Sequence, residues 1–209
     1  MRLRPRFALA LIVLFWVPTV RAQEKCDQEL LLNPGCEEPL AGGEIPEWTE
    51  MTGRSWTVRF ADPPPSPDGG TGYFSPGSTI SMISELYQKQ FLSPDSLVLH
   101  NSFVWGAEIW TSAETPANTA WIQIAARDAV SSVLLLHDTG DITTGGKWER
   151  IGGTFSLPMG ARSIEMWLIC FRQTGTEYNV YFDNLYLVHR CSTPVRPATW
   201  GQLKALFKQ

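Results

Sequence analysis

Histidine, cysteine and positive charge are scarce in this sequence, and each shortage excludes a class of function. The three histidines are scattered and the four cysteines contain no C-x-x-C pair, so the spacing of a zinc site is missing. Lysine and arginine number 17, against 21 aspartates and glutamates. Nucleic acids and anionic membrane surfaces bind basic patches, so both are poor candidate partners for this chain.

Catalytic signatures are missing as well. The sequence has no G-x-S-x-G elbow, no H-E-x-x-H, no phosphate-binding glycine loop and no dinucleotide fingerprint. A glycosidase needs two carboxylates facing one cleft, and the spacing of Asp128, Asp138, Asp141 and Glu165 does not favour such a pair. We therefore expect a protein that is not an enzyme.

A long hydrophobic run occurs once, near the N-terminus. Arg2, Arg4 and Arg6 precede the apolar stretch from Phe7 to Val17, and small or aliphatic residues surround position 22. The run is shorter than the roughly 20 residues that span a bilayer. It predicts a cleaved secretory signal at 1–22, and hence a secreted or cell-surface protein without membrane insertion. An uncleaved N-terminal anchor is the alternative.

The remaining 187 residues (209 − 22 = 187) suit one all-β domain over 23–192, with a net charge near 13 − 21 = −8. Glycine- and proline-rich turns separate short apolar runs, a rhythm typical of a sandwich or barrel. A linker and a short amphipathic helix follow over 193–209, available to a protein partner or to the domain's own surface. The predicted strands are 29–33, 55–60, 79–87, 97–111, 120–127, 132–137, 148–157, 162–172 and 179–189.

Aromatic and polar side chains alternate with core residues in two of these strands. Ile122 and Ile124 take one face of strand 120–127, and alternation gives the other face aromatic, amide and guanidinium groups. Strand 162–172 is apolar on both faces, so one of them is covered or forms a groove. Flat rings stack on the C–H face of a sugar while planar polar groups bind its hydroxyls. The candidate sugar-binding residues are Trp121, Gln123, Trp167, Trp110 and Arg127; the structural alternative is that these aromatics pack the core.

A carboxylate interrupts an apolar stretch at each end of the predicted domain. Glu37 ends Leu31-Leu32-Asn33-Pro34-Gly35-Cys36-Glu37, and Asp183 lies within Tyr181-Phe182-Asp183-Asn184-Leu185-Tyr186-Leu187. Burying a carboxylate is costly unless it is paired or binds a cation. The two stretches therefore suggest one shared site that ties the first strand to the last.

The same stretches resemble the N-P-G-F-E … D-D/N-V-x-L frame of galactose-binding-like jelly rolls, including the carbohydrate-binding modules of families four, nine and twenty-two. Pro46-Glu47-Trp48 is similar to their early G-W, and Lys147-Trp148-Glu149-Arg150 with Gly153-Thr154-Phe155-Ser156-Leu157-Pro158 to their W-x-x-x-x-x-T-F-x-x-P. The resemblance implies an all-β, two-sheet antiparallel jelly-roll sandwich. It also implies that Trp48 and Trp148 are core residues.

In related modules a structural Ca²⁺ joins the two chain ends. Carried over by resemblance, its ligands would be Gly35, Glu37, Asp68, Thr71 and Asp183, and oxygen donors of this kind suit a hard cation. Turn capping or pairing with arginine is the alternative role for the two carboxylates. Cys36 stands where the family has phenylalanine, which is a departure from the pattern.

Disulfides are predicted from the oxidising compartment and the even number of cysteines. If the first and last strands pair antiparallel, Cys26 falls near Cys191, and Cys36 remains to pair with Cys170. Four cysteines allow three connectivities, and a zinc site is the other alternative.

Together these features predict a secreted, non-catalytic domain that binds a polysaccharide or oligosaccharide on the face of one sheet. A secreted structural or protein-interaction scaffold without sugar binding is the alternative. A calcium ion is the expected cofactor.

Overall fold

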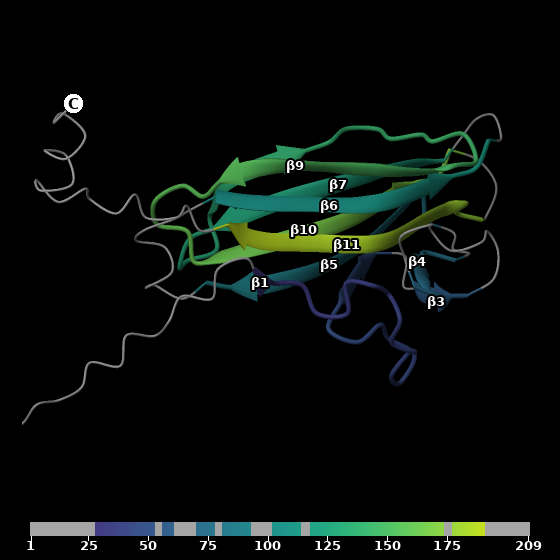
Figure 1. Cartoon of the computed structure of the whole chain (residues 1–209), viewed down its shortest axis with the longest axis horizontal. Coiled ribbons are helices and arrows are strands. Elements are labelled where there is room, and N and C mark those ends of the chain that lie inside the picture. Colours follow the sequence, from purple (N-terminus) through teal and green to yellow (C-terminus); the bar gives the residue numbers. More distant parts are fainter. Residues whose placement is uncertain are drawn as a thin grey trace, which may run out of the picture.

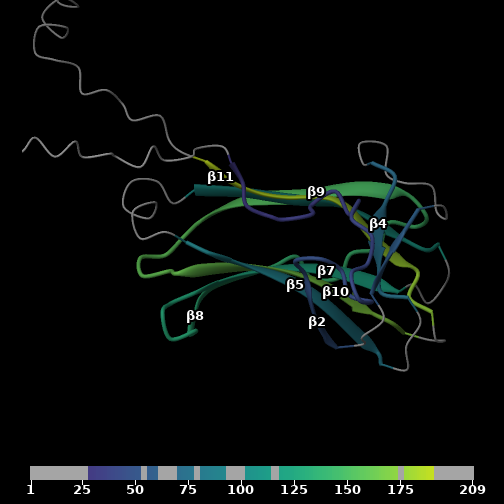
Figure 2. The same cartoon turned by 90° about the horizontal axis from the view of Figure 1, so that it is seen from below.

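Two antiparallel β-sheets pack face to face in the computed structural model of this chain (Figure 1, Figure 2). The structure describes residues 28–52, 56–60, 70–77, 81–92, 102–113, 118–173 and 177–190. Within these ranges the regular elements are eleven strands, and no helix long and apolar enough to cross a membrane is found. The predicted leader and the predicted C-terminal helix lie outside the described residues.

The six-stranded sheet has the order β3-β4-β11-β6-β9, with β1 paired to β11. Its strands are β1 (Gln28–Glu29), β3 (Thr57–Arg59), β4 (Tyr73–Ser75), β6 (Ser102–Thr111), β9 (Trp148–Ser156) and β11 (Val180–Arg190). The five-stranded sheet has the order β2-β5-β10-β7-β8. Its strands are β2 (Thr49–Thr52), β5 (Ile83–Phe91), β7 (Thr119–Arg127), β8 (Val133–Asp138) and β10 (Ser163–Phe171).

The core lies between the sheets and follows the two-residue period of the strands. Every second residue of β7 and β10 is apolar and fully buried, and β6 and β11 contribute the opposing layer. The fold is thus the predicted all-β, two-sheet antiparallel jelly-roll sandwich. Side chains that meet in this core include Ile122, Ile124, Ile164, Met166, Leu168, Phe103, Trp105, Ile109, Phe182 and Leu187.

Two strands escaped prediction and one was displaced. β2 and β4 have no counterpart among the predicted strands, and the strand predicted at 79–87 lies at 83–91. Tyr73 and Phe74, which follow a glycine-rich stretch of sequence, are fully buried in β4. Phe74 is the Cα partner of both Phe182 and Val58, so neighbouring strands turn this short segment into sheet.

The first and last strands pair antiparallel, which is the arrangement assumed for the Cys26–Cys191 disulfide. Gln28 is the Cα partner of His189 and Glu29 that of Val188. The Glu29 carboxylate reinforces this closure, because its Oε1 accepts hydrogen bonds from the N–H of Leu31 (2.9 Å) and of Leu187 (2.8 Å). The two ends of the described chain therefore lie side by side in the six-stranded sheet.

The predicted Cys36–Cys170 disulfide is wrong, because both residues are buried free thiols. Cys170 belongs to β10 of the five-stranded sheet, whereas the Cys36 Sγ lies 3.6 Å from the carbonyl oxygen of Phe182 on the six-stranded sheet. Facing sheets pack about 10 Å apart, so the two thiols belong to different layers. Burial raises the pKa of each thiol well above its usual value. Cys26 and Cys191 lie outside the described residues.

Candidate functional site

A pair of stacked aromatic rings stands on the outer face of the five-stranded sheet. Tyr87 on β5 and Trp167 on β10 are Cα partners, and their ring centroids lie 4.3 Å apart with an interplanar angle of 12°. Their neighbours in sequence, Leu86, Met166 and Leu168, point into the core and are fully buried. Both rings remain partly exposed; because each covers one face of the other, a ligand can contact the outer faces and the edges of the pair.

Polar side chains continue this row toward the next two strands. Gln123 on β7 is the second Cα partner of Trp167, and its Nε2 donates to Asp138 Oδ2 at 3.3 Å. Asp138 on β8 is in turn the Cα partner of Gln123. One step along β7, the indole N–H of Trp121 donates to the Asp141 carboxylate. Four neighbouring strands spaced about 4.8 Å apart make the row from Tyr87 to Asp138 about 14 Å long.

A buried carboxylate organises the charges of the same face. Glu165 is 4% exposed and accepts three interactions. Its Oε2 lies 2.7 Å from Arg127 Nε and 3.2 Å from the Trp167 indole nitrogen, and its Oε1 lies 3.3 Å from Lys89 Nζ. Arg127 also donates to the carbonyl of Ser131 (3.1 Å). Glu165 thus fixes the orientation of the Trp167 ring and engages the two basic groups beside it.

We call this surface the aromatic face and define it by Tyr87, Lys89, Trp121, Gln123, Arg127, Asp138, Asp141, Glu165 and Trp167. Four of the five predicted sugar-binding residues lie on it, as strand alternation indicates. Trp110 does not: it lies on β6 of the other sheet, with its ring 5.0 Å from that of Tyr181. Alternation assigns a residue to a face of its strand but not to a sheet, so the sequence could not show that Trp110 lies apart from the other four. Lys89 was missed because it lies beyond the predicted strand 79–87, and Tyr87, although inside that strand, was missed because the sequence does not show that it pairs with Trp167.

Trp110 belongs instead to a second aromatic cluster, on the outer side of the six-stranded sheet. Tyr73 contacts Trp148 and Tyr181 edge-on, at 5.9 and 5.2 Å between centroids. The Arg59 guanidinium lies 6.0 Å from the Tyr181 ring centre. Trp148 is partly exposed here, so its predicted core role is wrong, whereas Trp48 is 5% exposed and packs on Phe74 as predicted.

Among the described residues predicted to hold calcium, Glu37 and Thr71 are in direct contact. Glu37 Oε1 accepts hydrogen bonds from the N–H of Thr71 (2.6 Å) and of Gly72 (3.0 Å), and Oε2 accepts one from the Thr71 hydroxyl (2.8 Å). Desolvation acts to raise the pKa of Glu37, but these hydrogen bonds outweigh it and lower the pKa below its usual value. Burial raises the pKa of the Cys36 thiol, and the negative charges of Asp183 and Glu37 raise it further.

Asp183 has an acidic neighbour that the sequence did not reveal. Glu108 on β6 is its Cα partner; Asp183 is fully buried and Glu108 is 4% exposed, with a buried Oε2 that has no hydrogen-bond partner. Two adjacent buried carboxylates suit a hard cation, so the chemistry of this end fits Ca²⁺. Asp68 lies outside the described residues, and the described side chains contain no group of three or more metal-binding residues. Calcium binding stays a prediction.

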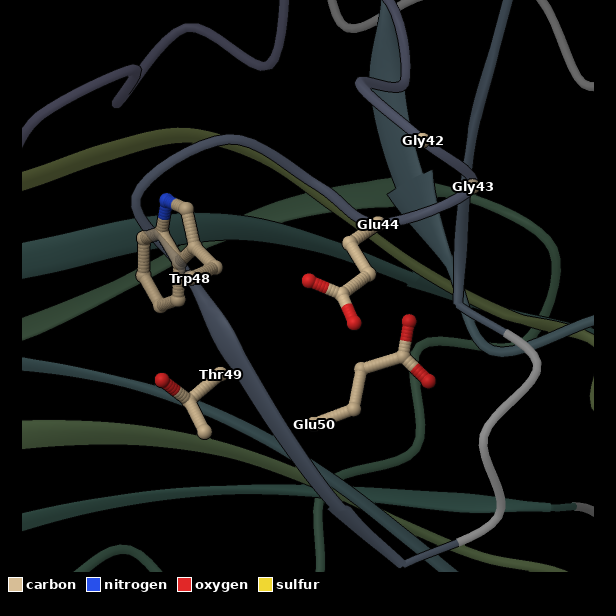
Figure 3. Close-up of a pocket in the computed structure, with 6 residues that line it drawn as sticks. All are labelled: Gly42, Gly43, Glu44, Trp48, Thr49 and Glu50. Carbon is tan, nitrogen blue, oxygen red and sulfur yellow. The ribbon is translucent and has the colours of Figure 1, made fainter.

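A pocket of about 430 Å³ lies at the β2 edge of the five-stranded sheet. In Figure 3 the carboxylates of Glu44 and Glu50 point toward one another across it, beside Trp48 and the backbone of Gly42 and Gly43. Thr49, which also lines the pocket, is the Cα partner of Tyr87. The pocket therefore adjoins the Tyr87 end of the aromatic face and adds acidic acceptors there.

The β-sandwich fold is shared with solved structures of several functional classes. No protein-family model and no curated protein matches the sequence. Solved structures do match. The family 61 module TmCBM61, solved in complex with β-1,4-galactotriose, is 16% identical with a TM-score of 0.52; the match covers 78% of this chain and 99% of that one.

Two enzymes share the fold with TM-scores similar to that of the module. The enzymatically active domain of tailspike protein 4 of bacteriophage CBA120 gives a TM-score of 0.55 at 14% identity, over 77% of this chain. This chain spans about a fifth (21%) of that protein. The Stig cyclase Fisc from Fischerella sp. TAU gives 0.52 at 14% identity, over 79% of this chain and 99% of that one. At these identities the comparisons establish the fold, and the fold carries several functions.

Proposed function

We propose that this chain is a secreted, non-catalytic carbohydrate-binding domain that holds a polysaccharide or oligosaccharide on its aromatic face. The observation that carries the proposal is the stacked Tyr87–Trp167 pair, partly exposed and continued by Gln123 and Asp138. A ring of this kind covers the C–H face of a sugar. The amide and carboxylate beside it are placed for the sugar hydroxyls, whose binding requires donors and acceptors together.

The charges of the face favour a neutral glycan. Lys89 and Arg127 are both engaged by Glu165, at 3.3 and 2.7 Å. Asp138 and Asp141 remain exposed at the other end of the row. Uronic acids and sulfated sugars would be repelled by the Asp138 and Asp141 carboxylates, and both Lys89 and Arg127 are already paired with Glu165. Neutral sugars would find hydrogen-bond acceptors in the same carboxylates.

Binding to arrayed plant, algal and microbial polysaccharides tests the proposal, followed by titration calorimetry with the best ligand. We expect binding to at least one neutral glycan, with no release of reducing ends during incubation. Stronger binding to alginate, pectin or sulfated polysaccharides would contradict the charge argument. Silence across all neutral glycans would reject the sugar-binding function and favour the scaffold alternative.

A further inference from the structure

Strand β8 is the outermost described strand on one side of the sheet that carries the aromatic face. Within the described residues β8 is paired with β7 alone, so the backbone groups of its other side form an open edge. Val133, Leu134 and Leu136 are 49%, 39% and 56% exposed. Val130 and Met159, at 79% and 99%, extend the apolar surface around them. Proteins usually protect such edges, because open apolar strands pair with other chains.

The other outer strands of the two sheets are protected in the expected ways. β2 and β3 are only four and three residues long, and β2 carries Glu50. β9 is nine residues long, but its exposed positions include Glu149, Arg150 and Thr154. Short length and charge are the devices that prevent edge pairing. The stretch from Val133 to Leu136 has neither a charge nor a proline.

We propose that β8 pairs antiparallel with the β8 of a second copy of this chain, joining two five-stranded sheets into one of ten strands. An antiparallel edge is complementary to itself, which is the requirement of a two-fold interface. The protein carries a formal net charge of −4, so two copies repel each other over most of their surface. An interface between copies is therefore favoured where the surface carries no charge. The apolar stretch of β8 brings leucine against leucine there without opposing like charges.

Dimerisation of this kind has a consequence for the aromatic face. The two-fold axis of an antiparallel strand pair is perpendicular to the sheet, so both aromatic faces lie on the same side. One long polysaccharide can then engage both copies, and the second binding event becomes intramolecular. This consequence rests on the proposed function, whereas the dimer itself does not.

Sedimentation velocity over a concentration series, without sugar, tests the dimer. We expect the wild type to reach twice the monomer mass, and Leu134→Lys to remain monomeric with an unchanged circular dichroism spectrum. Val133→Lys serves as the second variant if Leu134→Lys does not fold. Thr154→Lys is the matched control on the exposed edge strand β9, and it should dimerise like the wild type.

Two results would overturn the proposal. One is a wild type that stays monomeric at every concentration. If hydrogen exchange then shows that the β8 amides are protected in the monomer, another segment of the chain covers this edge, and the proposal is equally overturned. The other is a Leu134→Lys variant that still dimerises, which would place the interface elsewhere.

The sugar arm separates this proposal from the function on which it builds. We expect Leu134→Lys to bind a long polysaccharide at least about tenfold more weakly than the wild type, because the avidity of linked sites is lost. Its affinity for a short oligosaccharide should not change. A protein that dimerises through β8 but binds no glycan would reject the sugar-binding function and leave the dimer standing.

Discussion

Truncation of Trp167 to alanine separates a ligand-binding role from a structural one. The indole lies on the outer face of β10, stacked on Tyr87 and hydrogen-bonded to Glu165. Its flanking residues Met166 and Leu168 fill the core from the opposite face and are untouched by the change. Trp167→Ala therefore removes a surface ring without opening a cavity between the sheets.

The expected cost in stability follows from these two contacts. A stacked aromatic pair contributes about 0.5–1.5 kcal/mol beyond its buried area, and a hydrogen bond a net of about 0.5–1.5 kcal/mol. We expect the free energy of unfolding to fall by about 1–3 kcal/mol. Truncation of a core tryptophan such as Trp105, which is 1% exposed, costs about 3–5 kcal/mol.

The same substitution should remove a larger share of the binding free energy than of the free energy of unfolding. A tryptophan that anchors a ligand carries about 2 kcal/mol or more of the binding free energy, so Kd should rise about thirtyfold or more. Calorimetric titration with the best glycan and urea unfolding measure the two effects. Trp110→Ala is the matched control, because this tryptophan is also partly exposed but lies on the other sheet.

The reasoning fails if Trp167→Ala binds the glycan as the wild type does, or if Trp110→Ala weakens binding equally. It also fails if Trp167→Ala unfolds with the energy loss of a core truncation, since the ring would then be part of the hydrophobic core.

Four further predictions concern other parts of the molecule. Glu165→Gln keeps an oxygen that can accept from the Trp167 indole but loses both ion pairs, whereas Glu165→Ala loses the indole hydrogen bond as well. Calorimetry should therefore show weaker glycan binding by Glu165→Ala than by Glu165→Gln. Equal losses of affinity would contradict the role of Glu165 in positioning the Trp167 ring. Calcium at a hundredfold excess over Kd should stabilise the fold by about 2.7 kcal/mol relative to chelator, and Asp183→Asn should abolish this; an unchanged melting midpoint argues against the site. Because the folded-state pKa of Glu37 is lowered, its stabilisation is complete above the unfolded value of about 4.3 and disappears as the pH falls through the folded value. Glu37→Gln should therefore flatten the stability profile in that acid range, and an unchanged slope would refute the assignment. Non-reducing peptide mapping should find Cys26 bonded to Cys191, a bridge that in the chain-entropy model contributes about 4–5 kcal/mol, whereas free thiols at both positions would exclude it.

The sandwich and one half of the aromatic face could be predicted because they depend on local patterns. The two-residue period of β7 and β10 places Trp121, Gln123 and Trp167 on the side away from the core whatever their neighbours are. Such information is present in each segment by itself. The carboxylates singled out in sequence, Glu37 and Asp183, do not form the pairing of β1 with β11, which joins Gln28 to His189 and Glu29 to Val188.

The rest of the face depends on strand pairing, which a single segment does not encode. Trp167 meets Tyr87 across a pairing that joins positions 80 residues apart, and Glu165 meets Lys89 in the same way. Trp110 lies on β6 of the other sheet, and its own strand pattern does not encode which sheet the strand joins. β4 has only three residues, too few to show the alternation of a strand in the sequence. All three are buried because neighbouring strands cover them.

The position of the chain ends determines how this domain can be displayed. Gln28 and Arg190 belong to β1 and β11, and hence to the sheet that does not carry the aromatic face. A dye, a bead or a neighbouring domain joined directly at Gln28 or Arg190 is thus attached to the opposite layer of the sandwich. Immobilisation at these two positions should leave the aromatic face directed toward the solution.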